Sequence, residues 1–519
     1  MGYLGGSTTH RARPPALAPA LALAALCLLA GAPGVAAGEL IVVTGDRAVR
    51  SFDPAVPEPS EVAMRPPRTG AAAAAHVRPL AAAAGRPGAG ARAVARALRR
   101  ELARNRIEPD ELRRWRRWHT LSRRSLRRLR GARRAQLRYV LGSVESLALR
   151  GRLTASRMPA AFLQLERNRQ YWRELPFPGA RDQVSFRGSP IVFTYFPGYG
   201  LQLHPLSTFK RANAMYGMCK RGDPGCDRDA LRDLLDEMTG LAVRRSRAFI
   251  AWEYMFHFGG GTPPWISGMA QATAIQALAR AAELLGEPGY VQTARRALGA
   301  FETAPPTGVR TTGPAGGVHY LQYSFAPRLF IFNAFLQALI GLHDFGKLAS
   351  DGRATGLFRV AEPEARAEVP LSDVGDWSRY SYAGAEATRE YHELMRELLQ
   401  SMCIRRLGPL YCDYARRYRG YMVDPPELSF DGPVRATAGE PTAIRFTVSK
   451  LSAIELNVYR GDKLVHHVLV SSFRRGSGQI GWLPRVAGTV RVELAAKELR
   501  TGLGKRDRAS GAIEVAPSP

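Results

Sequence analysis

Apolar residues recur every three or four positions between residues 143 and 424, which predicts a region built from α-helices. One predicted helical face carries Met269, Ala272, Ile275, Leu278, Ala282 and Leu285, and Gly286 follows where a helix would stop. Further helical patterns cover residues 291–301, 329–342 and 385–402, and the second is apolar on all sides, which indicates a buried helix. Helices in pairs, separated by loops rich in glycine, proline and aromatic residues, favour an α/α-toroid over residues 143–424 with its cleft at one end.

The hydrophobic period changes to two after Pro425 and Pro426. Short alternating runs separated by turns follow at residues 444–448, 454–459, 464–470, 479–482, 490–494 and 512–515. These runs predict a β-sandwich over residues 425–519. An alternating stretch at residues 184–196 predicts a small β region before the helices. The expected fold class is mainly α: an α/α-toroid with a small β region before it and a C-terminal β-sandwich.

The first 142 residues differ in composition from the rest. Basic residues precede an apolar run and a small-residue site that ends at Ala37, so residues 1–37 are interpreted as a signal peptide, with an uncleaved N-terminal anchor as the alternative. Residues 38–95 are dominated by alanine, proline, glycine and arginine and predict a flexible tether. Residues 96–142 predict arginine-rich helices. We therefore expect a secreted or extracytoplasmic protein, membrane-tethered where the N-terminal segment is retained.

About half of the net charge of +29 lies in the arginine-rich segment. The stretch from Arg92 to Arg138 holds 18 arginines and four acidic residues, which gives a local charge of +14. A segment of this kind can bind an acidic polysaccharide, an anionic membrane surface or nucleic acid. Export argues against nucleic acid. The alternative is a solvated helical arm without a specific ligand.

Four cysteines follow residue 37, an even number that fits an oxidising compartment. Pairing of Cys219 with Cys226 and of Cys403 with Cys412 would close short loops, although the sequence leaves the connectivity open. A zinc site is disfavoured because no two cysteines are two residues apart and no histidine stands at ligand spacing beside them. We expect no required cofactor, and leave open a structural divalent cation and a homodimer.

Residues 376–394 combine three tyrosines and a histidine with two arginines, one of which stands beside the first tyrosine. These are Tyr380 and Tyr382 beside Arg379 on a predicted loop, and Tyr391 and His392 on the first turns of the helix that follows. Two groups on a loop and two on a helix form a plausible layout for proton exchange. The alternative is core packing, because Tyr391 shares a helical face with the leucines and methionines that follow it.

Three sequence blocks stand out in the central region. The first is Pro263-Pro-Trp-Ile-Ser-Gly-Met-Ala-Gln-Ala-Thr-Ala, the second runs from His319-Tyr-Leu-Gln-Tyr to Asp344, and the third is the tyrosine-rich stretch with Glu390-Tyr-His. Together they resemble the C-terminal catalytic domain of D-glucuronyl C5-epimerases, which convert glucuronate to iduronate in heparan-type polysaccharides. The resemblance covers residues 186–424. It implies an α/α-toroid catalytic domain preceded by β structure, and tyrosines that exchange a proton at C5 on opposite faces of a uronate.

The resemblance also implies roles for individual residues. The implied catalytic residues are Tyr391, which matches the family's Tyr-His pair, Tyr380 just upstream, and Tyr323 at the end of the His-Tyr-Leu-Gln-Tyr motif. The residues expected to bind substrate are Arg379, Tyr199, Gln271, Gln322, Asn333, His392, Arg389 and Trp265, with Tyr199 contributed by the β region. The chain departs from the family at Gln322, because the family carries an acidic residue there.

The chemistry explains why such groups are needed. Removing the proton next to a carboxylate places more negative charge on a group that is already negative, so positive or hydrogen-bonding groups must lie nearby. A tyrosinate costs about 4 kcal/mol at neutral pH unless a cation stabilises it, and Arg379 is the expected cation. The leading interpretation is C5-epimerisation of D-glucuronate to L-iduronate in an acidic polysaccharide. The alternatives are a uronate lyase and, because of Gln322, a non-catalytic glycan-binding or envelope protein.

Overall fold

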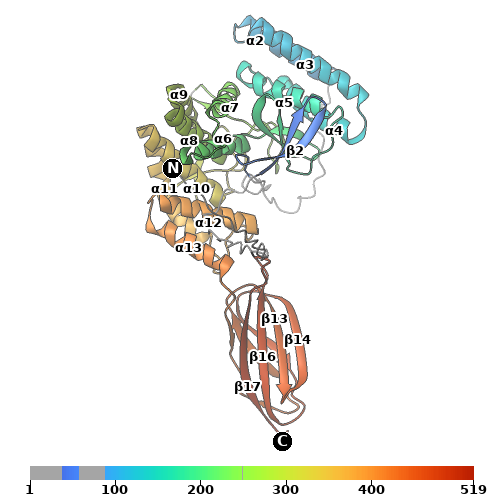
Figure 1. Ribbon diagram of the computed structural model, residues 1–519, viewed down its shortest axis with the longest axis vertical. Coiled ribbons are helices and arrows are strands. Elements are labelled where there is room, and N and C mark those ends of the chain that lie inside the picture. Colours follow the sequence, from blue (N-terminus) through green and yellow to red (C-terminus); the bar gives the residue numbers. More distant parts are fainter. Residues whose placement is uncertain (1–37, 58–87, 248, 519) are drawn as a thin grey trace, which may run out of the picture. The chain divides into compact units, whose positions relative to one another are not determined.

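The computed structural model describes residues 38–57, 88–247 and 249–518 (Figure 1). The signal peptide or anchor predicted for residues 1–37 lies outside these ranges. Within them, none of the helices combines the length and the apolar character needed to cross a membrane. The helices lie between residues 89 and 423, and the strands of the C-terminal region begin at Leu428. A first sheet combines strands that precede the helices with strands that lie among them.

The predicted small β region is confirmed as part of a five-stranded sheet with the order β2-β1-β3-β4-β5. Its strands are β1 (Gly38–Thr44), β2 (Arg47–Asp53), β3 (Gln183–Phe186), β4 (Ser189–Phe196) and β5 (Gly200–Leu203). Strand β1 pairs in parallel with β3 and antiparallel with β2, and the other neighbours are antiparallel.

The prediction of a tether over residues 38–95 is therefore wrong at both ends. Residues 38–53 form two strands, and helix α2 (Ala89–Ala103) begins before residue 95. The physical reason is that Leu40, Ile41 and Val43 lie buried in the sheet, although the surrounding composition is that of a linker. The remaining part of the predicted tether, residues 58–87, lies outside the described residues.

The arginine-rich segment is a set of packed helices, namely α2, α3 (Pro109–Arg128) and α4 (Gly131–Leu149), followed by η1 (Ala155–Arg157) and α5 (Met158–Tyr171). Trp115 on α3 is 2% exposed and stacks on Phe162 of α5, with ring centroids 5.6 Å apart. His119 on α3 lies 3.1 Å from Glu145 of α4. The apolar face of α3 is thus buried, and the arginines line its other face.

The helices that follow are α6 (Pro205–Arg221), α7 (Arg228–Gly240), α8 (Gly268–Leu285), α9 (Pro288–Ala297), η2 (Leu298–Phe301), α10 (Phe332–Leu348), α11 (Gly352–Leu371), α12 (Arg389–Ile404) and α13 (Pro409–Val423). Helix α8 packs against α6 and α10, α10 against α11, and α12 against α13. Helix α8 ends at Gly286 as predicted, because that glycine adopts a left-handed conformation with φ 71°. Helix α10 is buried throughout its first ten residues, as its composition predicted. The closed toroid stays a prediction.

Two disulfides connect neighbouring helices, and both predicted pairs are confirmed. Cys219 at the end of α6 bonds Cys226 just before α7, and Cys403 at the end of α12 bonds Cys412 in α13. Short hairpins complete the helical region: β6 (Val243–Arg244) with β7 (Ile250–Ala251), and β8 (Arg310–Thr312) with β9 (Val318–Tyr320).

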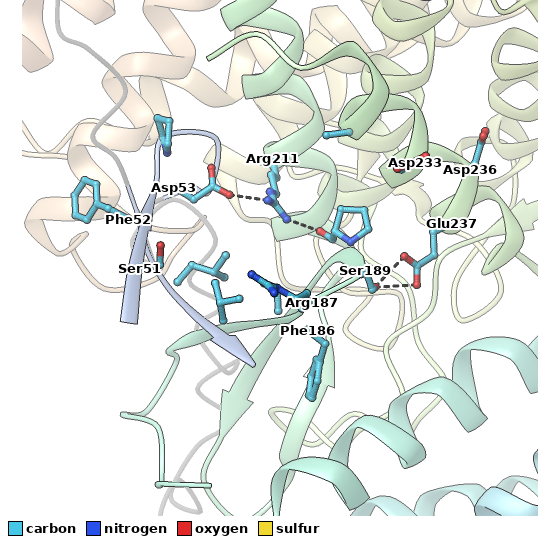
Figure 2. Close-up of a pocket in the computed structure, with 17 residues that line it drawn as sticks. Ser51, Phe52, Asp53, Phe186, Arg187, Ser189, Arg211, Asp233, Asp236 and Glu237 are labelled. Carbon is cyan, nitrogen blue, oxygen red and sulfur yellow. Dashed lines mark hydrogen bonds and ion pairs between the residues drawn. The ribbon is translucent and has the colours of Figure 1, made fainter. Parts of the chain in front are cut away.

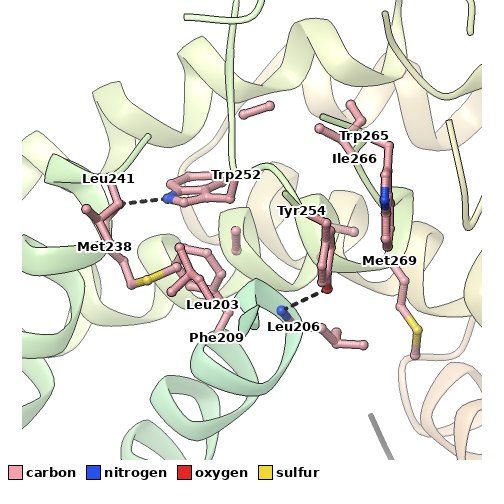
Figure 3. Packing of buried hydrophobic residues seen from close by; sticks show 14 of the residues in the cluster. Leu203, Leu206, Phe209, Met238, Leu241, Trp252, Tyr254, Trp265, Ile266 and Met269 are labelled. Atoms are coloured by element: carbon pink, nitrogen blue, oxygen red, sulfur yellow. Dashed lines mark hydrogen bonds between the residues drawn. The ribbon is translucent and has the colours of Figure 1, made fainter. Parts of the chain in front are cut away.

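The core beneath the sheet contains large aromatic residues held by hydrogen bonds (Figure 3). Trp252 donates its indole N–H to the carbonyl of Met238 at 2.7 Å, and the hydroxyl of Tyr254 accepts from the amide of Leu206 at 3.3 Å. Trp265 stacks on Tyr254 with centroids 4.3 Å apart and an interplanar angle of 7°. The polar ends of these side chains are therefore satisfied where they are buried.

The C-terminal region forms two sheets, as the alternating pattern predicted. One contains β10 (Leu428–Phe430), β12 (Thr442–Val448) and β15 (Gly476–Trp482). The other has the order β11-β17-β16-β13-β14, with β11 (Arg435–Thr437), β17 (Arg506–Ala516), β16 (Gly488–Glu498), β13 (Ser452–Arg460) and β14 (Lys463–Phe473) (Figure 1). Side chains from both sheets share one apolar cluster. In a β-sandwich the facing sides of the two sheets contribute side chains to one apolar core in this way. We call residues 425–518 the C-terminal β region.

Candidate active site

The loop of residues 373–388 joins α11 to α12 and carries Tyr380. Its backbone is held from within, because the amide of Tyr380 donates to the carbonyl of Ala385 at 3.1 Å and the amide of Ala387 to the carbonyl of Ser378 at 2.8 Å. The amide of Tyr382 donates to the carbonyl of Phe330 at 2.9 Å, just before α10. We call residues 373–388 the tyrosine loop. These bonds explain why α12 begins at Arg389 and not at residue 385, where the periodicity predicted it.

The structure brings the three predicted catalytic tyrosines together. The rings of Tyr380 and Tyr391 meet edge to face with centroids 4.6 Å apart. Tyr323 is 1% exposed, and its pKa is raised well above 10 by burial, by the neighbouring phenols of Tyr380 and Tyr391, and by a hydrogen bond to Tyr380. The hydroxyls of Tyr323 and Tyr380 are therefore hydrogen-bond partners within this buried group. We call these three residues the tyrosine cluster.

The short distance within the cluster limits where a sugar can bind. Aromatic rings with centroids 4.5 to 7 Å apart are in direct contact, so the rings of Tyr380 and Tyr391 leave no space for a sugar ring between them. A sugar bound at this cluster would lie beside the pair and not between the two rings. The expectation that these two tyrosines act from opposite faces of one sugar does not fit this arrangement.

Tyr199 reaches toward the cluster from the turn between β4 and β5. Its ring contacts Tyr139 at 4.8 Å and Phe256 at 5.9 Å. Phe258 then links Phe256, at 5.8 Å, to Tyr323, at 5.6 Å. A continuous path of aromatic rings thus connects the β region with the tyrosine cluster. Burial raises the pKa of Tyr199, so its hydroxyl keeps its proton at neutral pH.

Two polar residues beside Tyr199 were missed by the sequence reasoning. The hydroxyl of Tyr139 lies 2.9 Å from Nδ1 of His257 and accepts from the His257 amide at 2.8 Å. Tyr139 belongs to α4, in the arginine-rich segment, and its helical spacing resembles that of any buried aromatic residue. No local signal separates it from the core residues around it, and only the packing of α4 against β5 places it here.

Three of the residues expected to bind substrate, Gln271, Trp265 and His392, use their polar groups in hydrogen bonds within the protein. The amide group of Gln271 accepts from the Trp252 amide at 3.0 Å and donates to the Trp252 carbonyl at 2.9 Å. Trp265 donates to the carbonyl of Phe256 at 2.8 Å and is 1% exposed. These contacts favour a structural role for both residues, because their polar groups have partners and their faces are covered.

His392 is the third of these residues and is fully buried. Its ring stacks on Trp377 with centroids 3.7 Å apart, Nδ1 lies 2.8 Å from the hydroxyl of Ser378, and Nε2 lies 3.0 Å from the carbonyl of Tyr418. Burial lowers the pKa of His392 to about 4, so the ring is neutral at physiological pH. Its role in this structure is to hold the tyrosine loop against α13.

The two predicted arginines lie at the border with the C-terminal β region. Arg379 donates to the carbonyl of Gly384 at 3.0 Å, and Arg389 donates to the carbonyl of Thr501 at 2.9 Å. Arg379 also lines a cavity together with Arg474, Arg475 and Arg500 of the C-terminal β region. The pKa of Tyr323 is shifted most by burial and then by the neighbouring tyrosines, and both influences raise it.

Gln322 and Asn333 lie close to the cluster in sequence and are buried, with 4% and 6% of their surface exposed. Within the described part of the chain, the Oε1 atom of Gln322 has no hydrogen-bond partner. An unpaired buried carbonyl is costly, and substrate-binding positions are one place where that cost is tolerated. Gln322 is also the residue at which the sequence departs from the D-glucuronyl C5-epimerase pattern, where an acidic residue is expected.

A larger cavity of about 660 Å³ lies elsewhere, between the sheet and helices α6 and α7 (Figure 2). Two of its charged groups have partners within the protein: Arg211 bonds Asp53 at 2.6 Å, and Glu237 accepts from the hydroxyl of Ser189 at 2.8 Å. Burial raises the pKa of Glu237. None of the proposed site residues lines this cavity. Among the described residues, no group of three or more potential ligands is arranged to hold a metal ion.

A family model for the C-terminus of D-glucuronyl C5-epimerase matches residues 245–420. This segment belongs to that family. The epimerase-family segment contains the whole tyrosine cluster, whereas Tyr199 and Tyr139 precede it. The D-glucuronyl C5-epimerase of Caenorhabditis elegans is 29% identical over 130 residues, which are 23% of this chain and 21% of that protein.

Two further proteins are similar to this chain. An uncharacterized protein of Methanocaldococcus jannaschii is 24% identical over 190 residues, which are 36% of this chain and 62% of that protein. The chain thus spans less than two thirds of each of these curated relatives. The structure of cellobiose 2-epimerase from Spirochaeta thermophila aligns with 15% identity and a TM-score of 0.32, over 57% of this chain and 73% of that one. A similarity of that size supports no conclusion about activity.

Proposed function

We propose that this protein epimerises D-glucuronate residues to L-iduronate in an acidic polysaccharide, by removing and returning the proton at C5. The observation that supports the proposal best is the contact among Tyr323, Tyr380 and Tyr391 inside the epimerase-family segment. A group of three buried or partly buried phenols, one of which follows Gln322 with its unpaired amide oxygen, is hard to explain as packing alone, because each hydroxyl carries a desolvation cost.

The hydrogen bond within the cluster suggests which tyrosine acts as the base. Tyr323 keeps its proton, because its pKa is raised, and in our proposal it donates this hydrogen bond to the oxygen of Tyr380. A donated hydrogen bond stabilises a phenolate, so Tyr380 is the better base. Tyr391, in contact with the Tyr380 ring, confines that side chain. In this proposal Tyr380 removes the C5 proton as a phenolate and becomes neutral, the negative charge passes to the sugar carbanion, and the hydrogen bond from Tyr323 stabilises the phenolate before the transfer.

Inversion requires a proton donor on the other face of the sugar. Tyr199 is our candidate, because it approaches from a different element and its raised pKa keeps it protonated. Gln322 and Asn333 would bind the uronate through hydrogen bonds, since the carbanion formed at C5 places more charge on its carboxylate. A phenol at each face lets the intermediate be reprotonated from the side opposite to the base.

Helix α3 supports an acidic polymer as the substrate. Its solvent-facing side carries exposed arginines on successive turns over about 30 Å. Those without an ion pair to any other described residue are Arg116, Arg117, Arg123, Arg124, Arg127 and Arg128. A linear polyanion can bind along such a row, and an anionic membrane surface is the second candidate partner for it.

Deuterium incorporation tests the proposal. Purified protein is incubated with heparosan, a glucuronate polymer, in deuterated water, and C5 deuterium and iduronate are measured. We expect Tyr380→Phe to lower exchange at least about 100-fold with little change in polymer affinity, because it removes the proposed base. Tyr382→Phe is the matched control, because Tyr382 lies on the same loop but is 44% exposed, and it should retain full exchange.

The same assay distinguishes the alternatives. Unsaturated chain ends that absorb in the near ultraviolet would identify a uronate lyase acting through the same carbanion. Binding of the polymer without exchange or cleavage would identify a glycan-binding protein, which the glutamine at position 322 favours. Full exchange in Tyr380→Phe would contradict the assignment of the base.

A further inference from the structure

A cavity of about 520 Å³ lies where the tyrosine loop meets the C-terminal β region. The loop contributes Val374, Asp376, Arg379, Ala385 and Glu386, and the β region contributes Arg474, Arg475 and Arg500. Arg474 and Arg475 form the turn between β14 and β15, and Arg500 follows β16. The cavity wall thus holds four arginines and two acids.

Both acids are bound by the same arginine. Arg500 donates from Nε and Nη2 to Asp376 at 3.1 Å and from Nη1 to Glu386 at 2.8 Å. Asp376 also accepts from the amide of Leu451 at 3.0 Å. The side chain of Arg500 is 12% exposed and that of Asp376 4%. Glu386 also faces Arg474 and is 33% exposed, so its charge is shared among several arginines, and four arginines against two acids leave the cavity wall with a net positive charge.

The other three arginines have mostly carbonyl partners. Arg379 donates to Gly384 at 3.0 Å and Arg475 to Gly375 at 3.4 Å, while Arg474 is 88% exposed and lies 3.9 Å from the nearest oxygen of Glu386. A carbonyl accepts a hydrogen bond but does not cancel a positive charge. Gly375 has φ 88°, and a Cβ there would collide with the guanidinium of Arg475. The loop is therefore shaped to admit that side chain.

We propose that this cavity is a subsite for an acidic group of the polysaccharide, a carboxylate or a sulfate on a sugar next to the one that reacts. The inference depends on the proposed function for its substrate class. Arg379 directly precedes Tyr380 in the sequence, so the cavity wall and the proposed base belong to the same loop. The C-terminal β region would then bind substrate, and a small recessed anion site fits a charged sugar better than it fits a flat membrane surface.

Removing the two turn arginines tests the subsite on the full chain. Arg474→Ser combined with Arg475→Ser is compared with Arg435→Ser combined with Arg485→Ser, which removes the same charge from exposed positions of the same region. The control arginines lie near the Gly488 end of β16, about 33 Å from its Glu498 end. Affinity for heparosan and for N-sulfated heparosan oligosaccharides is measured by calorimetry, alongside KM and kcat.

We expect the subsite variant to raise Kd and KM roughly 2- to 30-fold, as two exposed ion pairs would, with kcat unchanged and the control variant unaffected. A larger loss for the sulfated polymer identifies sulfate as the anion, and an equal loss identifies carboxylate. Equal effects of both variants, or no effect of either, would overturn the subsite. If the wild-type chain shows no exchange, the proposed reaction fails, but the calorimetric comparison still decides whether the subsite exists. Thermal unfolding checks that both variants are folded.

Discussion

Arg500 holds both halves of the tyrosine loop from the C-terminal β region, and its removal should loosen the loop. Its guanidinium bridges Asp376, before Tyr380, and Glu386, after it. It also lies over the ring of Trp377 at 5.6 Å. The substitution Arg500→Ala would leave Asp376, which is 3% exposed, with a buried charge and without its cationic partner.

The expected cost follows from these contacts. Removing one partner of a buried ion pair costs about 3 to 5 kcal/mol, because the remaining charge stays desolvated. Glu386 is 33% exposed and can be solvated by water, so its contribution is small. The amide of Leu451 still donates to Asp376. We therefore expect a cost of about 3 kcal/mol.

Hydrogen exchange of the loop measures this cost locally. A loss of about 3 kcal/mol corresponds to an approximately 100-fold lower protection of the Arg379 and Ala387 amides. We also expect a lower kcat, because the loop carries the proposed base. Arg474→Ala is the matched control, since its nearest acid oxygen is 3.9 Å away and its side chain is 88% exposed.

A double-mutant cycle separates the ion pair from packing. Asp376→Asn removes the charge but keeps the shape, so Arg500→Ala should cost less by about 1 to 3 kcal/mol in that background. Unchanged protection in Arg500→Ala, or a change equal to that of the control, would refute the reasoning that Arg500 fixes the loop.

Three further predictions concern other parts of the chain. Burial and a hydrogen bond to Glu364 raise the pKa of Glu368 to about 9. The folded state then keeps a proton that the unfolded chain loses near pH 4.5, so stability should fall as pH rises from about 4.5 to about 9, by up to about 1.4 kcal/mol per pH unit. Glu368→Gln should flatten that slope in urea unfolding, and an unchanged slope would contradict the assignment. Gln322→Met should not destabilise the fold, because it removes an unpaired buried carbonyl, but should raise KM several-fold; a destabilised variant with unchanged KM would mean a structural glutamine. Changing the four arginines between Arg123 and Arg128 to serine should lower the affinity for heparosan and make that affinity less dependent on salt concentration. Four such changes in the C-terminal β region, away from the subsite, should have neither effect.

Local patterns were sufficient for much of the fold. Helix α8 with its glycine stop, the buried helix α10 and the C-terminal strands follow from signals within a few residues, and the cysteine spacing suggested the two pairs that the structure connects. Strands β1 and β2 form a local hairpin that was assigned to the adjoining tether, and only the pairing of β1 with β3 is non-local, across more than a hundred residues. A non-local pairing of that kind leaves no periodic signal in the residues that separate the two strands.

The sequence by itself determined which residues carry the candidate chemistry, because tyrosines in matching motifs can be recognised one position at a time. The tertiary structure alone decided how they are used. It places Tyr323 beside Tyr380 and Tyr391. The polar groups of Gln271 and His392 are used in hydrogen bonds within the protein, and Arg379 lines a basic cavity together with the C-terminal β region. The physical reason is that proton affinity and charge depend on burial and on neighbours, and both are set by chain segments that are far apart in sequence.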